Sequence, residues 1–373
     1  MHLHKKAALI QSAVFAIFIG ALCVLHFAIP DKTFSEQENR SLQTAPRFRL
    51  SSLFSGSLTS SLEDYVTDQF PFRDNWTSLK ARCELLSGKD ENNGVYLCAG
   101  ETLLEPYGAP TRADMDARLD AVNARTEHAE VPVYFALIPS ASEIWREMLP
   151  EGAPNDSQQT EIDYAYSRVS AQTIDICSVL DAHSEEAIFY RTDHHWTTLG
   201  AYYGYTAVAQ AMGLDPVPLD AYTETVVSDS FYGTTYSASG FRWVAPDTIS
   251  TYVEQGDAVI TNYPSGTAEP GTLYDESYLL VKDKYSYFFG GNTPLLTIET
   301  GNACISLLIF RYSYMDSLSP FLFAHFSEIH ILDLRYYRSS LQAYLDANDF
   351  SAVLVCYSLN NFSTETSLLL LGG

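Results

Sequence analysis

The hydrophobic residues of this chain begin with one long uncharged run. From Ala7 to Ile29 there is no Asp, Glu, Lys or Arg, and the run is long enough to cross a bilayer as a helix. Lys5 and Lys6 precede it, so the positive-inside rule places the N-terminus in the cytoplasm and the rest of the chain outside. A cleaved signal peptide is the alternative, but the run is long for one and no Ala-x-Ala pattern follows. We expect a single-pass membrane protein, anchored through residues 7–29, with an extracytoplasmic C-terminal body.

Beyond this run the pattern changes twice. Residues 31–60 are polar and loop-like, and Leu62 to Leu86 has helical periodicity interrupted at residues 70–74. From about residue 90 onward, short apolar runs alternate with amphipathic segments, the pattern of a mixed α/β domain. We therefore expect three regions: a membrane anchor (1–30), an extracytoplasmic tether with a helical lead-in (31–90), and one α/β domain (91–373).

The α/β domain is predicted to begin as strand, helix and strand at Glu101–Tyr107, Asp114–Ala129 and Val131–Ile138. This alternation favours parallel pairing of the two strands. A helix is expected from Thr198 to Met212, with Gly213 as its stop.

The C-terminal part repeats the alternation. The predicted strands are Ile305–Phe310, Ile329–Leu334 and Ala352–Tyr357, and the predicted helices are Ser317–Phe326 and Ser339–Ala347. Three strands with two intervening helices indicate a doubly wound sheet, whose ligand sites lie at the carboxyl ends of the strands. Residues 214–300 are rich in Tyr, Thr, Ser and Gly and are predicted to be a β- and loop-rich insertion between the two halves of the core.

The amino-acid composition excludes some classes of binding partner. The chain has 22 Lys and Arg against 46 Asp and Glu, a net charge of −24, which argues against nucleic-acid binding because that requires a basic patch. The cysteines outside the anchor are unevenly spaced and predict neither a disulfide framework nor a zinc site. Cys304 and Cys356 lie in apolar runs and are expected in the core.

The candidate chemistry centres on Asp193 and His195, because a carboxylate can orient a histidine that moves a proton. The strand-end rule supplies a nucleophile, since strand 305–310 leads to Ser313 in a position where a turn would present its hydroxyl. Strand 352–357 leads to Asn360, whose amide could stabilise an oxyanion. The structural alternatives are a helix cap for Ser313 and a turn residue for Asn360.

His194 is assigned separately. Adjacent side chains on an extended segment point in opposite directions, so we expect His194 to face the core or the following helix and to have a structural role. A metal site built from three consecutive residues is disfavoured because neighbouring ligands seldom converge and no further His or Cys has ligand spacing. We expect no metal and no cofactor.

The segment around Asp193 and His195 resembles a known protein family. The segment Asp193-His194-His195-Trp196, within residues 192–205, resembles the signature of the DHHW protein family, known from Gram-positive bacteria. The blocks at 38–40, 68–73, 284–292 and 333–337 resemble further parts of that family. More remotely the chain is similar to alginate O-acetyltransferases of the AlgJ and AlgX type and to SGNH hydrolases. The resemblance implies an SGNH-hydrolase-like core in permuted motif order, because the histidine segment precedes the nucleophile strand.

Carried over by motif, the resemblance makes Asp193, His195 and Ser313 the catalytic residues. Asn360 becomes the oxyanion candidate, and Trp196, His194 and Arg335 lie around the site. The family usually reads Lys-Asp-Ser-Tyr at the nucleophile turn, whereas this chain has Arg311-Tyr312-Ser313-Tyr314. It also has Ser358 where the SGNH block has glycine.

Two classes of function therefore remain. The first is a cell-surface carbohydrate O-acetyltransferase or acetylesterase with a Ser-His-Asp triad. Its expected partners are a cell-envelope polysaccharide and an acyl donor, and a membrane protein that transfers acyl groups is one candidate for that donor. The 25 Tyr, 20 Phe and 4 Trp could furnish stacking platforms for sugars or simply pack the core. The second is a catalytically inactive binding or scaffold protein of the cell envelope, a hypothesis that Tyr312 favours.

Overall fold

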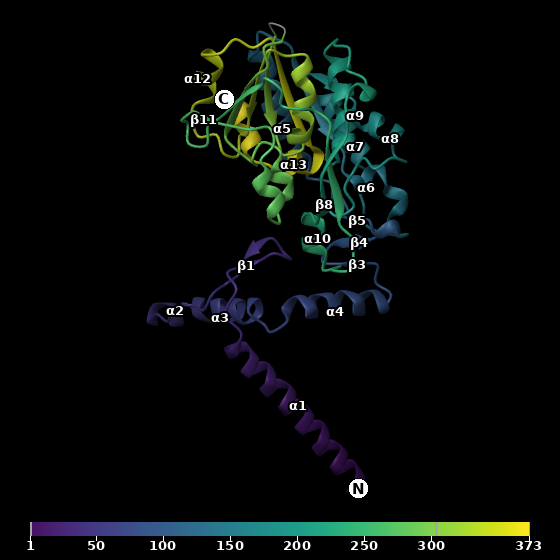
Figure 1. Ribbon diagram of the computed structural model, residues 1–373, viewed down its shortest axis with the longest axis vertical. Coiled ribbons are helices and arrows are strands. Elements are labelled where there is room, and N and C mark those ends of the chain that lie inside the picture. Colours follow the sequence, from purple (N-terminus) through teal and green to yellow (C-terminus); the bar gives the residue numbers. More distant parts are fainter. Residues whose placement is uncertain (1, 303–304, 373) are drawn as a thin grey trace. The chain divides into compact units, whose positions relative to one another are not determined.

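A computed structural model describes residues 2–302 and 305–372. The chain forms two compact units, one comprising Met1–Lys89 with Gly240–Arg242 and the other comprising Asp90–Ser239 with Trp243–Gly373. Figure 1 shows the order of their elements along the chain.

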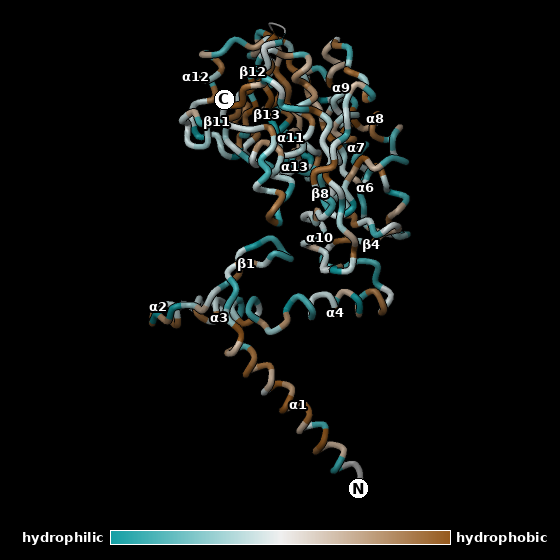
Figure 2. The backbone as a smooth tube through the Cα atoms, in the orientation of Figure 1, coloured by the Kyte–Doolittle hydropathy of each residue, from teal (hydrophilic) through white to brown (hydrophobic). Residues whose placement is uncertain are grey.

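The first unit is helical apart from a short hairpin. Its elements are α1 (His2–Ala28), β1 (Phe34–Ser35), β2 (Arg40–Ser41), α2 (Leu50–Phe54), α3 (Ser57–Asp68) and α4 (Arg73–Leu86). Within Lys5–Ala28 of α1, an 18-residue window has a mean hydropathy of 2.4, and none of that window is buried. Figure 2 shows the hydrophobic colouring of α1. By length and composition this helix can cross a membrane, a property that anchors and signal sequences share.

Ion pairs join the two sequence blocks of this unit. Arg40 Nη2 lies 2.5 Å from Asp68 Oδ1, and Arg73 Nη1 lies 2.6 Å from Glu38 Oε1. The hairpin is therefore tied to the junction between α3 and α4. The interruption predicted near Phe70 falls at this junction, where α3 ends at Asp68 and α4 begins at Arg73.

The second unit is built on a large mixed sheet, which confirms the predicted α/β class. The sheet has eight strands in the order β11-β10-β12-β14-β13-β15-β6-β7. In chain order they are β6 (Val133–Ile138), β7 (Gln172–Ile174), β10 (Val259–Asn262), β11 (Glu269–Pro270), β12 (Leu295–Glu299), β13 (Ser306–Arg311), β14 (Glu328–Leu332) and β15 (Ala352–Ser358). Strands β14, β13, β15, β6 and β7 pair in parallel, whereas β12 pairs with β14 and β10 in antiparallel fashion.

Two expectations differ from the structure. The segment 101–107 contributes only β5 (Leu103–Leu104), which pairs antiparallel with β4 (Val95–Leu97) in a small sheet that also contains β3 (Glu91–Asn92). It does not join β6, because residues 99–102 form a tight turn that returns the chain to β4. Residues 214–300, predicted to be a β- and loop-rich insertion between the two halves of the core, do contain strands, but β10, β11 and β12 extend the central sheet. Only β8 (Thr225–Phe231) and β9 (Asp247–Thr251) form a ribbon of their own.

The helices predicted at 114–129, 198–212 and 339–347 are present, whereas residues 317–326 form the end of a short α-helix followed by a 3-10 helix, Ser319–Ala324. The second unit contains several α-helices. They are α5 (Arg112–His128), α6 (Ala141–Ile144), α7 (Gln158–Arg168), α8 (Ile176–Ala182), α9 (Thr198–Ala211), α10 (Thr234–Ser239), α11 (Met315–Leu318), α12 (Leu341–Asp346) and α13 (Leu359–Thr364). α9 packs against α8 and α11, and α5 packs against α13. Strands β6 and β15 are buried along their whole length, the pattern expected for strands covered on both faces. Cys356 is fully buried in β15 as predicted, whereas Cys304 lies outside the described residues.

Candidate active site

The segment containing Asp193 is a closed loop ending at the start of α9. An isolated bridge joins Phe189 to Trp196, and Tyr190 N donates to His195 O at 3.2 Å. Thr197 then caps α9, its side chain accepting a hydrogen bond from Gly200 N, as a Thr at this position commonly does. The loop is thus held at both ends.

Two glycines of α9 allow Trp196 to be buried beneath the helix. A Cβ at Gly200 would lie 2.1 Å from Ile188 O, and one at Gly204 would lie 2.7 Å from the Trp196 ring. The indole is fully buried, and its Nε1 donates to Tyr314 O at 3.0 Å. Trp196 therefore joins the histidine loop to the turn that carries Ser313.

Ser313 lies in the turn after β13, immediately before α11. Asp316 N donates to Ser313 O at 3.1 Å, which closes the turn. The serine does not cap α11, whose N-cap residue is Tyr314, and its hydroxyl instead faces His195.

The structure brings Asp193, His195 and Ser313 into one hydrogen-bonded chain. Ser313 Oγ lies 2.7 Å from His195 Nε2, and His195 Nδ1 lies 2.5 Å from Asp193 Oδ1. All three residues are buried, Ser313 retaining 9% exposure. A carboxylate that accepts from Nδ1–H leaves Nε2 unprotonated toward the serine, so the histidine can accept the hydroxyl proton.

Asp193 is held by more than the histidine. Its Oδ2 accepts from Thr234 N at 2.7 Å and from Thr234 Oγ1 at 3.0 Å. Burial would raise the pKa of this carboxyl, but the charges of His194 and His195 and the hydrogen bonds from His195 and Thr234 outweigh burial and hold the pKa well below its usual range. Gly233 leaves the necessary room, since a Cβ there would lie 2.2 Å from Asp193 Cβ.

His194 does not point away from His195 as expected. The two ring centroids lie 3.9 Å apart, because the segment bends here instead of running extended. His194 Nδ1 lies 2.6 Å from Thr234 Oγ1, and Tyr314 OH donates to His194 O. The His194 side chain retains 36% exposure, and its partial burial together with the adjacent His195 lowers the pKa of His194.

The donor atoms of Asp193, His194 and His195 lie within 4.8 Å of one another, close enough to hold a metal ion. Asp193 Oδ1 and His195 Nδ1 are already engaged with each other at 2.5 Å, and His194 Nδ1 and Asp193 Oδ2 share Thr234 as a partner. This arrangement suits proton transfer better than coordination, because a metal would have to displace these hydrogen bonds.

Tyr285 covers one face of the His195 ring. The two rings are stacked, with centroids 3.8 Å apart and an angle of 9° between their planes. The Tyr285 hydroxyl lies 3.3 Å from Ser313 O and 3.1 Å from Ser317 Oγ. One side chain therefore contacts both the candidate base and the backbone of the candidate nucleophile.

Asn360 lies in the first turn of α13, directly after β15. Because β15 and β13 are neighbouring parallel strands with Cys356 opposite Arg311, Asn360 and Ser313 leave the same edge of the sheet. Ser358 caps α13, and Asn360 Oδ1 is buried without a hydrogen-bond partner among the described residues. The unpartnered atom is an acceptor, so a hydrogen bond to an oxyanion would have to come from Asn360 Nδ2.

Arg335 does not contact the three-residue chain. Its guanidinium forms two hydrogen bonds with the buried Asp333, at 2.9 and 2.6 Å, and lies 3.6 Å from the centre of the Tyr312 ring. Tyr312 thus occupies the place beside Ser313 as a stacked ring. An acidic residue, Asp316, nevertheless follows Ser313 three positions later in the sequence. It is buried and forms an ion pair with buried Arg311.

Thr234, Gly233 and Tyr285 were not identified as site residues from the sequence. Thr234 and Gly233 lie in the segment predicted to be an insertion, and Tyr285 lies in a block that carries only the family resemblance. Glycine followed by threonine is a weak signal by itself. Their role arises from contacts with residues 41 and 28 positions away.

The sequence family described as DHHW protein matches residues 107–332. The probable alginate O-acetylase AlgJ of Pseudomonas syringae pv. tomato (strain ATCC BAA-871 / DC3000) is 24% identical over 233 residues, 58% of this chain and 57% of that protein. The matched region thus spans little more than half of that relative.

Two solved structures share the fold. A DHHW family protein from Eubacterium siraeum DSM 15702 has 25% identity and a TM-score of 0.66, covering 75% of this chain and 95% of that one. Bacillus cereus PatB1, solved with a sulfonyl adduct, has 21% identity and a TM-score of 0.62, covering 73% of this chain and 97% of that one.

Proposed function

The chain belongs to the DHHW protein family, as residues 193–196 predicted, and from this premise we propose that it is a serine-dependent carbohydrate O-acetyltransferase or acetylesterase. The observation that carries the proposal is the hydrogen-bonded chain from Asp193 through His195 to Ser313, with distances of 2.5 and 2.7 Å. The similarity to a protein described as a probable alginate O-acetylase supports the acyl group and the carbohydrate class. The doubly wound, SGNH-like core in permuted order belongs to the same proposal, because the histidine loop precedes the nucleophile strand.

The chemistry follows from the positions of the three residues. Ser313 Oγ attacks the acetyl carbonyl while His195 Nε2 takes its proton, and the resulting imidazolium is stabilised by Asp193. Collapse of the tetrahedral intermediate expels the donor alcohol, which receives the proton from His195, and leaves acetyl-Ser313. A sugar hydroxyl, or water in the esterase reaction, then gives its proton to His195 and attacks the acetyl carbon. Collapse of this second intermediate breaks the bond to Ser313 Oγ, which takes the proton back from His195, so the serine is regenerated and the acetylated sugar or acetate is released.

A direct test is turnover of 4-nitrophenyl acetate by the full-length chain in detergent micelles. We expect release of 4-nitrophenol above the buffer rate and covalent labelling of Ser313 by a sulfonyl fluoride. Neither signal should occur if the hydrogen-bonded chain is only structural.

Asn360 is proposed to donate to the oxyanion. We expect Asn360→Ala to lower kcat about 100-fold, because one preorganised donor contributes on this scale. Asn361→Ala, in the same helix, is the matched control and should keep wild-type kcat. Equal rates for the two variants would remove Asn360 from the mechanism.

Tyr285 is proposed to position His195. Tyr285→Phe keeps the ring and should lower kcat by only about 2–10-fold, the value of a lost hydrogen bond or two. Tyr285→Leu removes the stacked surface and should lower kcat about 100-fold, because small misplacements of a reacting group are costly. Separate measurement of kcat and Tm distinguishes this role from a purely structural one, in which Tm would fall and kcat of the folded fraction would not.

The N-terminal helix is proposed as an uncleaved anchor that leaves the body outside the cell. Protease added to intact cells should digest the body, and the untreated full-length chain should remain in the membrane fraction with Lys5 and Lys6 still present by mass spectrometry. A chain that lacks residues 1–30 after export would show instead that the helix is a cleaved signal.

Tyr312 favours a second candidate, a non-catalytic protein that binds a cell-envelope polymer. Its ring, stacked on Arg335 at 3.6 Å, stands where the family usually has an acid beside the serine. If the wild type turns over no acetyl ester, Tyr312→Asp is the reversion to test, and gain of turnover in that variant would identify Tyr312 as the residue that silences the site.

A further inference from the structure

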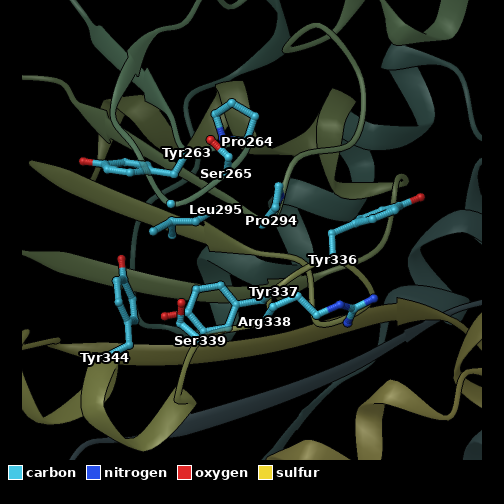
Figure 3. A pocket seen from close by; sticks show the side chains of 11 residues that line it. Tyr263, Pro264, Ser265, Pro294, Leu295, Tyr336, Tyr337, Arg338, Ser339 and Tyr344 are labelled. Atoms are coloured by element: carbon cyan, nitrogen blue, oxygen red, sulfur yellow. The ribbon is translucent and has the colours of Figure 1, made fainter.

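A cavity lined by tyrosines lies in the second unit, outside the candidate triad. Its volume is about 500 Å³, within the range of roughly 300–1,000 Å³ found for small-molecule sites. Figure 3 shows the side chains of Tyr263, Tyr336, Tyr337 and Tyr344 around a common opening. The remaining lining residues come from 264–266, 294–295 and 338–339.

The sheet register places this cavity at the same edge as Ser313. Leu332, the last residue of β14, is opposite Phe310 of β13 and Leu295 of β12. Asn262, the last residue of β10, is opposite Leu296. The segments 336–339, 294–295 and 263–266 therefore leave or enter the sheet at the edge from which the Ser313 turn emerges. Because neighbouring strands lie about 5 Å apart, these segments follow one another away from Ser313 in steps of about that length.

Contacts between side chains hold part of the cavity wall. The Tyr344 hydroxyl lies 2.6 Å from His330 Nδ1, and the Tyr337 and Tyr344 rings meet edge to face with centroids 5.9 Å apart. The Arg335 guanidinium lies between the ring of Tyr312, next to Ser313, and the ring of Tyr336 on the rim, at 3.6 and 5.1 Å. A continuous row of planar groups thus connects the nucleophile turn to the cavity.

The charge of the lining is unusual for this chain. It includes Arg338 and no Asp or Glu, although the whole chain carries a net charge of −24. Arg338 is exposed and forms no ion pair within residues 2–302 and 305–372. Its guanidinium, the phenols and the hydroxyls of Ser265 and Ser339 offer hydrogen bonds to a ligand rich in hydroxyl groups, and the aromatic faces offer stacking.

We propose that this cavity is a glycan subsite that holds a sugar unit of the acceptor chain, a few units from the hydroxyl that is acylated. The apolar face of the sugar ring lies on Tyr336 or Tyr337, and Arg338 donates to its oxygens. The step between neighbouring strands is similar to the length of one unit of a polysaccharide, so the chain runs along the sheet edge from the cavity to Ser313. This link to acylation rests on the proposed function, whereas sugar binding in the cavity does not.

Binding is tested without turnover. The full-length chain carrying Ser313→Ala, in detergent micelles, is titrated with β-1,4-linked oligosaccharides of glucose, N-acetylglucosamine and a uronic acid, from one to six units, with ligand-observed NMR as the readout. For at least one series we expect affinity to rise with length. Adding Tyr336→Ala should weaken binding of the longest member about 10-fold, and Arg338→Ala should weaken it similarly, while Tyr336→Phe should change it less than about twofold.

Gln342→Ala is the control, because Gln342 is an exposed residue in a different cavity, at the start of strands β15 and β6, and should not change binding. Absence of binding by all three series, or equal binding by the Tyr336→Ala protein, overturns the subsite, as does preference for a peptide or a plain aromatic compound. Turnover of 4-nitrophenyl acetate by the wild type is measured in parallel. Oligosaccharide binding through Tyr336 without any turnover would support the subsite and contradict the proposed enzymatic activity. Turnover without oligosaccharide binding would support the enzymatic activity and contradict the subsite.

Discussion

Replacing Ser313 with alanine should lower kcat for an acetyl ester by at least about 10⁴-fold and abolish labelling by a sulfonyl fluoride. The reason is that Ser313 Oγ is the atom within 2.7 Å of His195 Nε2, so no other hydroxyl is activated in its place. Release of acetate and transfer to an oligosaccharide are measured separately, since both pass through the same acetyl-serine. The loss should appear in kcat, because Ser313 bonds to the reacting carbon only as the reaction proceeds.

The double variant Ser313→Ala/His195→Ala should be no slower than either single variant, because residues of one catalytic unit do not contribute additively. Ser178→Ala, an exposed serine of α8, is the matched control and should behave as wild type. Wild-type turnover by the Ser313→Ala protein would rule out the serine mechanism.

The second large effect is expected for Asp193→Asn, which should lower kcat/KM about 10⁴-fold at neutral pH. An amide facing His195 Nδ1 can donate a hydrogen bond, which favours the tautomer with the proton on Nε2 and prevents that nitrogen from accepting the Ser313 proton. The exchange keeps the size of the side chain, so Tm measures any structural damage independently. Asp220→Asn, at an exposed position, provides the control, and a Asp193→Asn protein with near-normal kcat/KM would show that the carboxylate only supports the loop.

The pH dependence has a definite sign. The pKa of Asp193 is lower in the folded chain than in the unfolded chain. Its stabilising contribution is therefore complete above the ordinary Asp pKa of about 3.9 and is lost as the pH falls below that value. Thermal unfolding between pH 7 and pH 3 should show this acid-side loss in the wild type and a smaller loss in Asp193→Asn.

Much of the local structure could be predicted from the chain alone. The apolar runs at 305–310 and 352–357 became β13 and β15, and the run at 198–212 became α9, because periodicity and glycine stops act within a few residues. The spacing of Asp193 and His195 suggested their contact, and the strand-end rule selected Ser313. The four-residue signature also identified the family.

Other features depended on which segments meet after folding. The pairing partner of Leu103–Leu104, and the addition of β10–β12 to the central sheet, could not be predicted because short strands carry no signal for their neighbours. His194 lies beside His195 because the loop is bent between its attachments to Ile188 and α9. Thr234 and Tyr285 reach the site from distant segments. The four tyrosines of the cavity come together at one edge of the sheet from three separate segments of the chain. The sequence thus determined the chemical groups and the local elements. The tertiary structure alone decided which of these residues contact one another, since a contact between remote residues is set by sheet order and packing and leaves no local pattern in the chain.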